Sequence, residues 1–181
     1  METDDGEWLA MAAAGDEASF GSIVRAHQER LLGYAERMLG SRDSALDAVQ
    51  ETFLRLWGAR HRYSAEGGLD RLLLCILRNI CLDELRKAPL RGHELTEGVF
   101  DPSPGPDAEA SGRALRQAVR CAVLALPPEQ REVFVLTQYL GLTYPETADT
   151  LGCPVNTVAS RRHAAVMTLR RRLRSWTGEE E

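Results

Sequence analysis

The chain has 181 residues, of which 44% are hydrophobic and only 6% aromatic, and its formal net charge is −5. A chain of this length and composition can bury a core, but helical segments separated by a polar Pro/Gly stretch favour two small domains over one large one. The absence of strand-length runs of β-branched residues predicts an all-α fold. A negative net charge argues against a protein that binds nucleic acid over its whole surface, because neutralising phosphate needs Lys and Arg.

Charge is distributed unevenly along the chain. No Asp or Glu occurs between Thr150 and Arg174, whereas six arginines fall in that stretch, and acidic residues gather at both ends of the chain. Such a split favours one face for phosphate and another for a basic protein surface. The last four of these arginines alone are explained equally well as partners of a helix C-terminal dipole.

Several other classes of protein are excluded by residue spacing. The four cysteines lack C-x-x-C spacing and no histidine has a ligand partner at i, i+4, so we expect buried free thiols, no metal site and no cofactor. No apolar run reaches the roughly 18 residues of a membrane span, which predicts a cytoplasmic protein without membrane insertion. No residues have catalytic spacing, so we predict that the chain is not an enzyme.

The first part of the chain predicts an N-terminal tail and two helices. Residues 1–15 are assigned to the tail. Apolar residues then repeat at helical spacing from Phe20 to Leu39, and Gly40 ends this helix. A second helix is predicted after Ser41 and Ser44, either of which could cap it. Its apolar residues repeat at helical spacing from Ala45 to Trp57, and Gly58 ends it.

A basic loop and a third helix follow. Residues 58–68 lack helical periodicity, and they include basic side chains and one aromatic ring, which predicts a loop. From Leu69 to Leu85 apolar residues cover most of a helix and leave one polar strip. The strip consists of Arg71, Arg78, Asn79, Asp83 and Arg86. A largely buried helix that keeps a polar strip is a candidate for function.

Residues 88–111 predict a flexible linker, because the apolar pattern gives way to prolines, glycines and acids. Two small helical domains are therefore expected, at residues 16–87 and 112–175, with an acidic tail at 176–181.

The second domain begins with two predicted helices. One runs from Leu115 to Leu126, and Pro127 and Pro128 start the next, which reaches about Leu140. Thr143 and Glu146 then form a capping box that opens a short helix.

The last two helices have the proportions of a helix-turn-helix. The short one ends at Gly152, and a long one begins near Val155. Ala148, Gly152 and Val158 supply the small residue, the positive φ and the apolar contact that the motif needs. Short polar side chains and a guanidinium at the start of the long helix suit base edges and phosphates.

Five stretches together resemble the extracytoplasmic-function (ECF) sigma factors of the sigma-70 family of bacterial RNA polymerase. They are residues 46–57, 76–86, 126–127 with 131–134, 141–144 and 157–161, in both domains and in the family's order. The resemblance covers nearly the whole chain, and the run at 46–57 is highly specific.

The resemblance implies a division of labour between sigma region 2, in the first domain, and sigma region 4, in the second. The residues implied in binding core RNA polymerase, at the clamp helices of its largest subunit, are Asp47, Gln50, Glu51 and Leu54. Those implied at the promoter −10 element are Arg60, Arg62, Tyr63, Arg71, Arg78, Asn79, Asp83 and Arg86. Those implied at the −35 element are Asn156, Thr157, Ser160, Arg161, Arg162 and His163.

The resemblance also implies binding partners, and the sequence differs from the family's usual pattern at several positions. Core polymerase, promoter DNA and an anti-sigma factor, which family members commonly have, are the expected partners. The family often has an aromatic pair where this chain has Leu69 and Leu72, and a β-branched aliphatic residue where it has Thr147. Ala159 replaces a basic residue common in the last helix, and Arg162 replaces an apolar one.

Two alternatives remain at this point. A transcription regulator that binds DNA alone would explain the helix-turn-helix but leaves the helix from Asp47 to Trp57 without a purpose. An adaptor that has lost promoter binding and holds only protein partners would fit the substitutions near Arg162.

Overall fold

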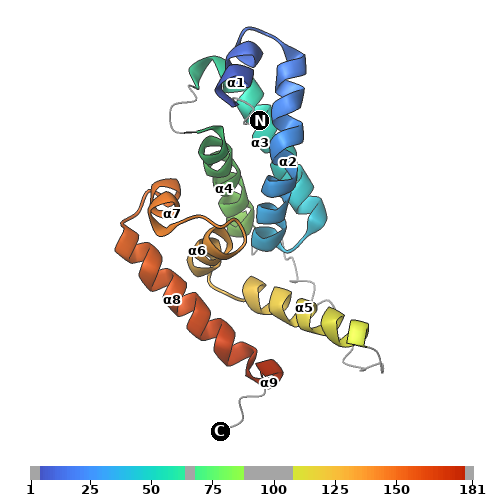
Figure 1. Cartoon of the computed structure of the whole chain (residues 1–181), viewed down its shortest axis with the longest axis vertical. Helices are drawn as coiled ribbons and strands as arrows, with labels where there is room; N and C mark the ends of the chain where they lie inside the picture. Colours follow the sequence, from blue (N-terminus) through green and yellow to red (C-terminus); the bar gives the residue numbers. More distant parts are fainter. Residues whose placement is uncertain (1–4, 64–67, 88–107, 178–181) are drawn as a thin grey trace. The chain divides into compact units, whose positions relative to one another are not determined.

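The computed structural model describes residues 5–63, 68–87 and 108–177. Every regular element in these residues is a helix, which confirms the all-α prediction (Figure 1). The chain divides into two compact helical units, residues 1–84 with 149–152 and residues 85–148 with 153–181. Helix α4 (Leu69–Lys87) is described with the first unit and α7 (Tyr144–Leu151) with the second, because the larger part of each belongs there. None of the helices in the described ranges combines the length and the apolar character that a bilayer crossing requires.

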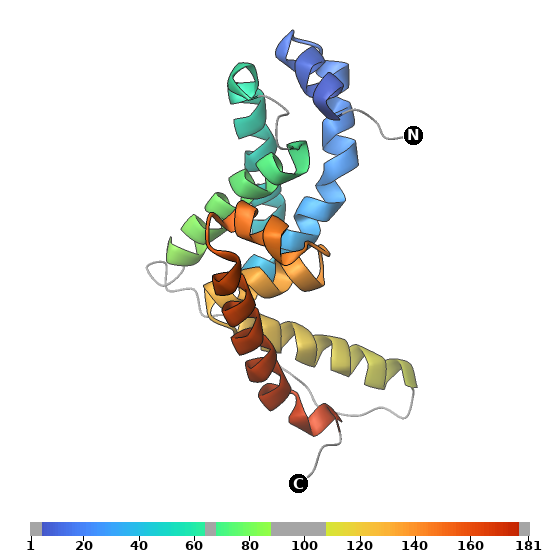
Figure 2. The same cartoon turned by 60° about the vertical axis from the view of Figure 1, so that its left-hand side comes forward.

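The first unit is built on a pair of long helices, α2 and α3, which lie side by side in both ribbon views (Figures 1 and 2). Its elements are α1 (Asp5–Ala13), α2 (Glu17–Leu39), α3 (Arg42–Ala59), the short 3₁₀ helix η1 (Arg60–Arg62) and α4 (Leu69–Lys87). The largest fully buried side chains of its core are Ile23, Leu31, Tyr34, Met38, Leu56, Leu69, Leu73 and Leu77.

Helix α1 occupies most of the segment that was expected to be a tail. Leu9 is 2% exposed and Ala12 is fully buried. Gly15, at φ +98°, turns the chain, and Asp16 then caps α2 by accepting hydrogen bonds from the two backbone amides at residues 18 and 19. The helix was missed because its few apolar residues form no extended stripe in the sequence, and tertiary packing buries them.

Glycine ended one predicted helix and not the other. Gly40, at φ +76°, ends α2 as predicted, and its amide donates to the Glu36 carbonyl at 2.9 Å. Gly58 does not have a positive φ, and α3 continues through it to Ala59. The predicted loop at 58–68 is therefore corrected: its first part is helical, as the end of α3 and as η1, and residues 64–67 lie outside the described residues.

The second unit contains the predicted pair of helices and the helix-turn-helix. Its elements are α5 (Ala108–Leu124), α6 (Pro128–Gln138), α7 (Tyr144–Leu151), α8 (Val155–Arg172) and α9 (Arg174–Thr177). α5 begins four residues inside the predicted linker, whose residues 88–107 lie outside the described part of the chain. α6 ends two residues before the expected Leu140.

Candidate functional site

An open apolar groove of about 600 Å³ runs between α2 and α3. Its lining residues are Glu17, Phe20, Val24, Gln28, Leu46, Val49, Gln50, Phe53, Leu54 and Trp57. Leu46 is 46% exposed and Leu54 is 57% exposed, which is unusual for leucines beside a well-packed core. Phe20 and Val24, which the sequence assigned to the core face of α2, are only half-buried because they line this groove.

The four residues predicted to bind core polymerase all lie on α3. Gln50 and Leu54 line the groove, and Asp47 is exposed beside them. Glu51 is half-buried and pairs with Arg55 one turn later, with Oε1 2.7 Å from Nε. An apolar trough with acidic side chains along one edge fits an amphipathic helix that has basic flanks. Leu46 lines the same groove without being one of these four, and its place one turn before Gln50 was the available signal.

Arg60 is engaged inside the first unit. Its Nη1 donates to the Trp57 carbonyl at 2.6 Å, and its Nε donates to the Ala12 carbonyl at 3.1 Å. Its guanidinium carbon lies 3.9 Å from the centroid of the Trp57 ring, at a distance typical of cation–π contacts. Arg60 therefore ties η1 to α1 and to the end of α3.

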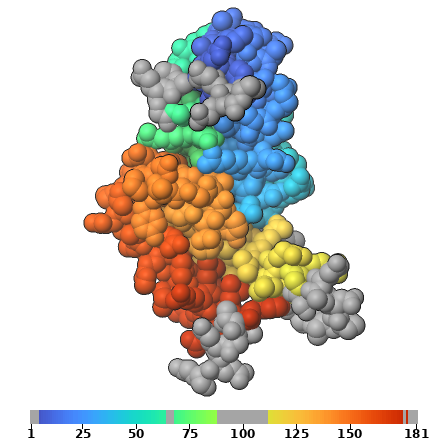
Figure 3. Space-filling view, viewed as in Figure 1, coloured from blue at the N-terminus to red at the C-terminus, as the bar shows by residue number. Residues whose placement is uncertain are grey.

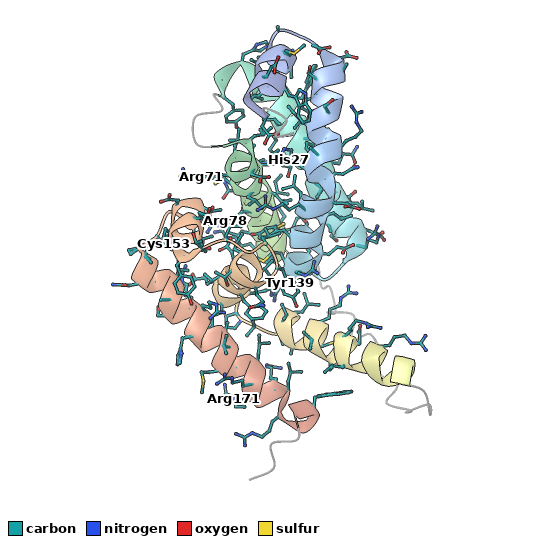
Figure 4. All side chains as sticks on the ribbon, in the orientation of Figure 1. His27, Arg71, Arg78, Tyr139, Cys153 and Arg171 are labelled. Carbon is teal, nitrogen blue, oxygen red and sulfur yellow. The ribbon has the colours of Figure 1, made fainter. Side chains whose placement is uncertain are left out.

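The other residues predicted at the −10 element lie in two groups. Arg62 is exposed at the end of η1, and Tyr63, directly after it, is half-buried. The second group is the polar strip of α4, in which Arg78 is half-buried and the exposed members are Arg71, Asn79, Asp83 and Arg86. Figure 4 shows Arg71 and Arg78 at successive levels of α4. The segment between the groups, 64–67, is outside the described residues.

The turn between α7 and α8 has the geometry predicted for a helix-turn-helix. The amide of Thr143 donates to Glu146 Oε2 at 2.7 Å, and the amide of Glu146 donates to Thr143 Oγ1 at 3.4 Å. These two reciprocal hydrogen bonds form the capping box. Gly152 has φ +62°. Ala148 is 6% exposed and Val158 is fully buried.

The N-terminal half of α8 carries the side chains predicted to read DNA. Three of them, Asn156, Ser160 and His163, are exposed, and three, Thr157, Arg161 and Arg162, are half-buried. α8 contains no acidic residue. Figure 3, which is coloured by residue number, shows the surface of this helix in orange-red.

Both arginines of this group have contacts that the sequence did not reveal. Arg161 Nη2 lies 2.6 Å from Oε2 of Glu129, in the first turn of α6. The Arg162 guanidinium lies 5.9 Å from the centroid of the Tyr144 ring. Neither partner could be found by periodicity, because each belongs to another helix.

The motif residues of α6 form a buried scaffold under the helix-turn-helix. Arg131 is 8% exposed, Glu132 is 1% exposed and Val133 is fully buried. Arg131 Nη2 donates to the Leu124 carbonyl and, at 3.2 Å, to the Leu126 carbonyl, so it closes the turn between α5 and α6. Burial lowers the pKa of Arg131.

The four cysteines form no disulfide, and they differ in burial. Cys81 is buried, Cys75 and Cys153 are half-buried and Cys121, on α5, is exposed, so the expectation of buried thiols holds in full only for Cys81 and is wrong for Cys121. Within the described ranges, no group of three or more potential ligands gathers as a metal site would require.

Comparison with known proteins places both units in one family. The family model for sigma-70 region 2 matches residues 23–89, and the model for sigma-70 region 4 matches residues 116–169. The ECF RNA polymerase sigma factor SigC of Mycobacterium tuberculosis is 35% identical over 159 residues, which cover 84% of this chain and 83% of the relative. The RNA polymerase sigma factor CnrH of Cupriavidus metallidurans is 31% identical over 174 residues, covering 89% and 91%.

Solved structures agree with these sequence matches. CnrH in complex with the cytosolic domain of CnrY matches with a TM-score of 0.72 and 26% identity, over 94% of this chain and 97% of that one. The sigma factor RpoE of Bartonella quintana, in complex with the anti-sigma factor NepR, matches with a TM-score of 0.66 and 24% identity, over 86% and 96%, and supports the fold. The resemblance stated from the motifs is thus confirmed, and the chain belongs to the ECF group of the sigma-70 family of RNA polymerase sigma factors.

Proposed function

We propose that this sigma factor binds core RNA polymerase through the α2–α3 groove and the exposed side chains beside it. The groove is the observation that carries the proposal, since Leu46 and Leu54 expose apolar surface that a stand-alone DNA-binding protein does not need. Asp47, Gln50 and Glu51 edge or line the same surface. The clamp helices of the largest polymerase subunit fit it as an amphipathic, basic partner.

The −10 element is proposed to contact η1, Tyr63 and the polar strip of α4. Arg62 is exposed and directly precedes Tyr63, and the strip adds Arg71, Asn79 and Arg86. Unstacking a base costs a few kcal/mol, which stacking and charge-assisted hydrogen bonds can offset. Arg60 is assigned a supporting role, because its guanidinium is engaged with Trp57 and Ala12.

The −35 element is proposed to contact the N-terminal half of α8. Exposed Asn156, Ser160 and His163 can reach base edges, and Arg161 and Arg162 can reach bases or phosphates. The absence of acidic residues along α8 keeps this face attractive to phosphate in spite of the negative net charge.

An anti-sigma factor is proposed as a further partner. One structural neighbour, the sigma factor RpoE, was solved in complex with the anti-sigma factor NepR, and another, CnrH, in complex with the cytosolic domain of CnrY. A cytoplasmic location, where core polymerase and the chromosome lie, follows from the same proposal. In this role the chain directs polymerase and catalyses no reaction of its own.

The test is to mix the purified chain with bacterial core polymerase, measure co-elution in size exclusion, and sequence the transcripts that the complex starts on genomic DNA. A stoichiometric complex with discrete start sites is the expected result. Absence of a complex would favour a stand-alone regulator, and a complex without specific starts would favour an adaptor that has lost promoter binding.

A further inference from the structure

His27 is a buried titratable residue that the proposed interfaces do not use. It belongs to α2 and is 7% exposed (Figure 4). Its Nδ1 lies 2.8 Å from Oδ1 of Asp70, on α4, and its Nε2 lies 3.2 Å from Oδ1 of Asp5, on α1. Arg30, one turn along α2, pairs with the second oxygen of Asp70. One imidazole ring therefore joins three helices of the first unit.

The hydrogen bonds around this ring require its charged form. A neutral imidazole has a single N–H, so one of its two nitrogens would face a carboxylate oxygen without a proton between them. The imidazolium ion donates to both carboxylates, and the charges of His27 and Arg30 then balance those of Asp5 and Asp70. The hydrogen bond to Asp70, with a smaller contribution from Asp5, raises the pKa of His27 against the lowering effect of burial.

Each carboxylate connects the ring to an element of the proposed −10 interface. Asp5 begins α1, whose Ala12 carbonyl accepts the hydrogen bond from Arg60 of η1 at 3.1 Å. Asp70 is the second residue of α4, the helix that carries the polar strip. The cluster is thus connected to both groups of residues that are assigned to the −10 element, through α1 to η1 and through Asp70 to α4.

We propose that His27 is a positioning residue for promoter opening: in its protonated form it holds α1 and the start of α4 together, and through them η1 and the polar strip. Because its side chain is buried, it acts through these elements and does not touch DNA. The inference rests on the proposed function, since it concerns the −10 interface of the assembled polymerase.

The test compares His27→Gln with the wild type in promoter opening by reconstituted holoenzyme, followed by permanganate reactivity of unpaired thymines between pH 6 and pH 9. Gln keeps a polar side chain but removes the titrating charge. The ratio of wild-type to variant opening at each pH removes the pH dependence of polymerase itself. This ratio should be largest at low pH and fall as the pH rises through the raised pKa of His27, by at most about tenfold per pH unit for one linked proton.

Two further variants separate positioning from general destabilisation. Asp5→Asn leaves the pair of His27 and Asp70 intact and should move the fall in the ratio to lower pH, with faster amide hydrogen exchange confined to α1 and η1. Arg42→Ala, which removes the ion pair with Glu36 at the other end of α2, is the matched control and should leave a flat ratio. If His27→Gln does not fold, Asp5→Asn decides the matter.

The outcomes are distinguishable. Affinity for core polymerase should be the same for His27→Gln and wild type, because His27 does not line the groove. A variant that opens promoters with the wild-type pH profile would overturn the positioning role and leave the proposed function intact. A wild-type chain that opens no promoter at any pH would instead overturn the proposed function.

Discussion

Arg161 has two competing partners in the proposed mechanism, Glu129 in the free chain and DNA in the complex. The Glu129 side chain is 68% exposed, and an ion pair this accessible contributes little to stability. A phosphate or a guanine edge can therefore displace the carboxylate at low cost. In the free chain, the pair holds the guanidinium at the first turn of α6, and the negative charge of Glu129 opposes indiscriminate contact with phosphate.

Replacing Arg161 with Ala should weaken binding to a duplex that carries the −35 sequence and should lower the salt slope by about one, because one phosphate or base contact is lost. Glu129→Gln should act in the opposite direction and raise affinity for unrelated duplexes. Fluorescence anisotropy over a salt series measures both effects. Arg116→Ala removes an exposed arginine of α5 and is the control. An unchanged slope in Arg161→Ala would show that the residue makes no contact.

Thr147 should be a site where a single substitution stabilises the chain. Its side chain is fully buried in α7, and its hydroxyl has no hydrogen-bond partner among the described residues. Thr147→Val replaces that hydroxyl by a methyl group of similar shape, which should add about 1 kcal/mol to the free energy of unfolding. Thermal unfolding measures this as a Tm higher by a few degrees. Thr137→Val is the contrasting control, since the Thr137 hydroxyl donates to the Val133 carbonyl at 2.8 Å.

The elements that the sequence predicted best are those whose ends are set by local chemistry. Gly40 and Gly152 take a positive φ and end their helices, and the capping box of Thr143 and Glu146 starts another. Prediction failed at Gly58, because a glycine that keeps a helical φ carries no stop signal. It also failed for α1, since burial of Leu9 depends on helices that come later in the chain.

The sequence was enough to choose which residues belong to the candidate site, but not to predict which side chains and carbonyls they contact within the chain. The polar strip of α4 and the start of α8 follow helical periodicity, so their members could be chosen from spacing alone. The contact of Arg60 with the Ala12 carbonyl spans 48 residues, and the contact of His27 with Asp70 spans 43. No periodic pattern encodes such pairs, because they arise only when separate helices pack.

At the level of a helix surface, Asp47→Ala combined with Gln50→Ala should weaken binding to core polymerase and leave the helical circular-dichroism signal unchanged. Both side chains are exposed, so the fold does not depend on them. A hydrogen bond contributes about 0.5–1.5 kcal/mol net, so the loss of one or two such bonds lowers affinity roughly tenfold. Competition binding to core polymerase gives the number. Glu29→Ala, an exposed acid of α2 outside the groove lining, is the control. Equal affinity of the double variant and the control would refute the assignment.

For the molecule as a whole, the two units should differ in how their stability depends on pH. The pKa of His27 is raised, so its contribution to the first unit is complete below its ordinary value of 6.5 and is lost as the pH rises through the raised value. The pKa of Asp70 is lowered, chiefly by the hydrogen bond from His27, so its contribution is present above its ordinary value of 3.8 and is lost as the pH falls through the lowered value. Stability of the first unit should therefore decline on both sides of an intermediate range.

Hydrogen exchange resolved by segment, from pH 4 to pH 9, measures this difference between the units. Amides of α2 and α4 should lose protection on the alkaline side in the wild type and keep a constant level in His27→Gln. Amides of α6 and α8 serve as an internal reference, because these helices contain none of the residues of the His27 cluster. A parallel loss of protection in both units would contradict the role of His27 in stability.

Trp57 belongs both to the groove and to the contact that supports η1, and this makes one indole ring a natural spectroscopic reporter. Its ring lines the groove, contacts the Phe20 ring at a centroid distance of 4.8 Å with the planes tilted by 59°, and lies against the Arg60 guanidinium. The chain has only two other tryptophans, Trp8 and Trp176. A chain labelled with 5-fluorotryptophan, with those two changed to Phe, would give a single ¹⁹F resonance against an unlabelled polymerase. Its chemical shift should change when polymerase occupies the groove. A second change on addition of promoter DNA would show that DNA binding alters the contact between Trp57 and Arg60 of η1.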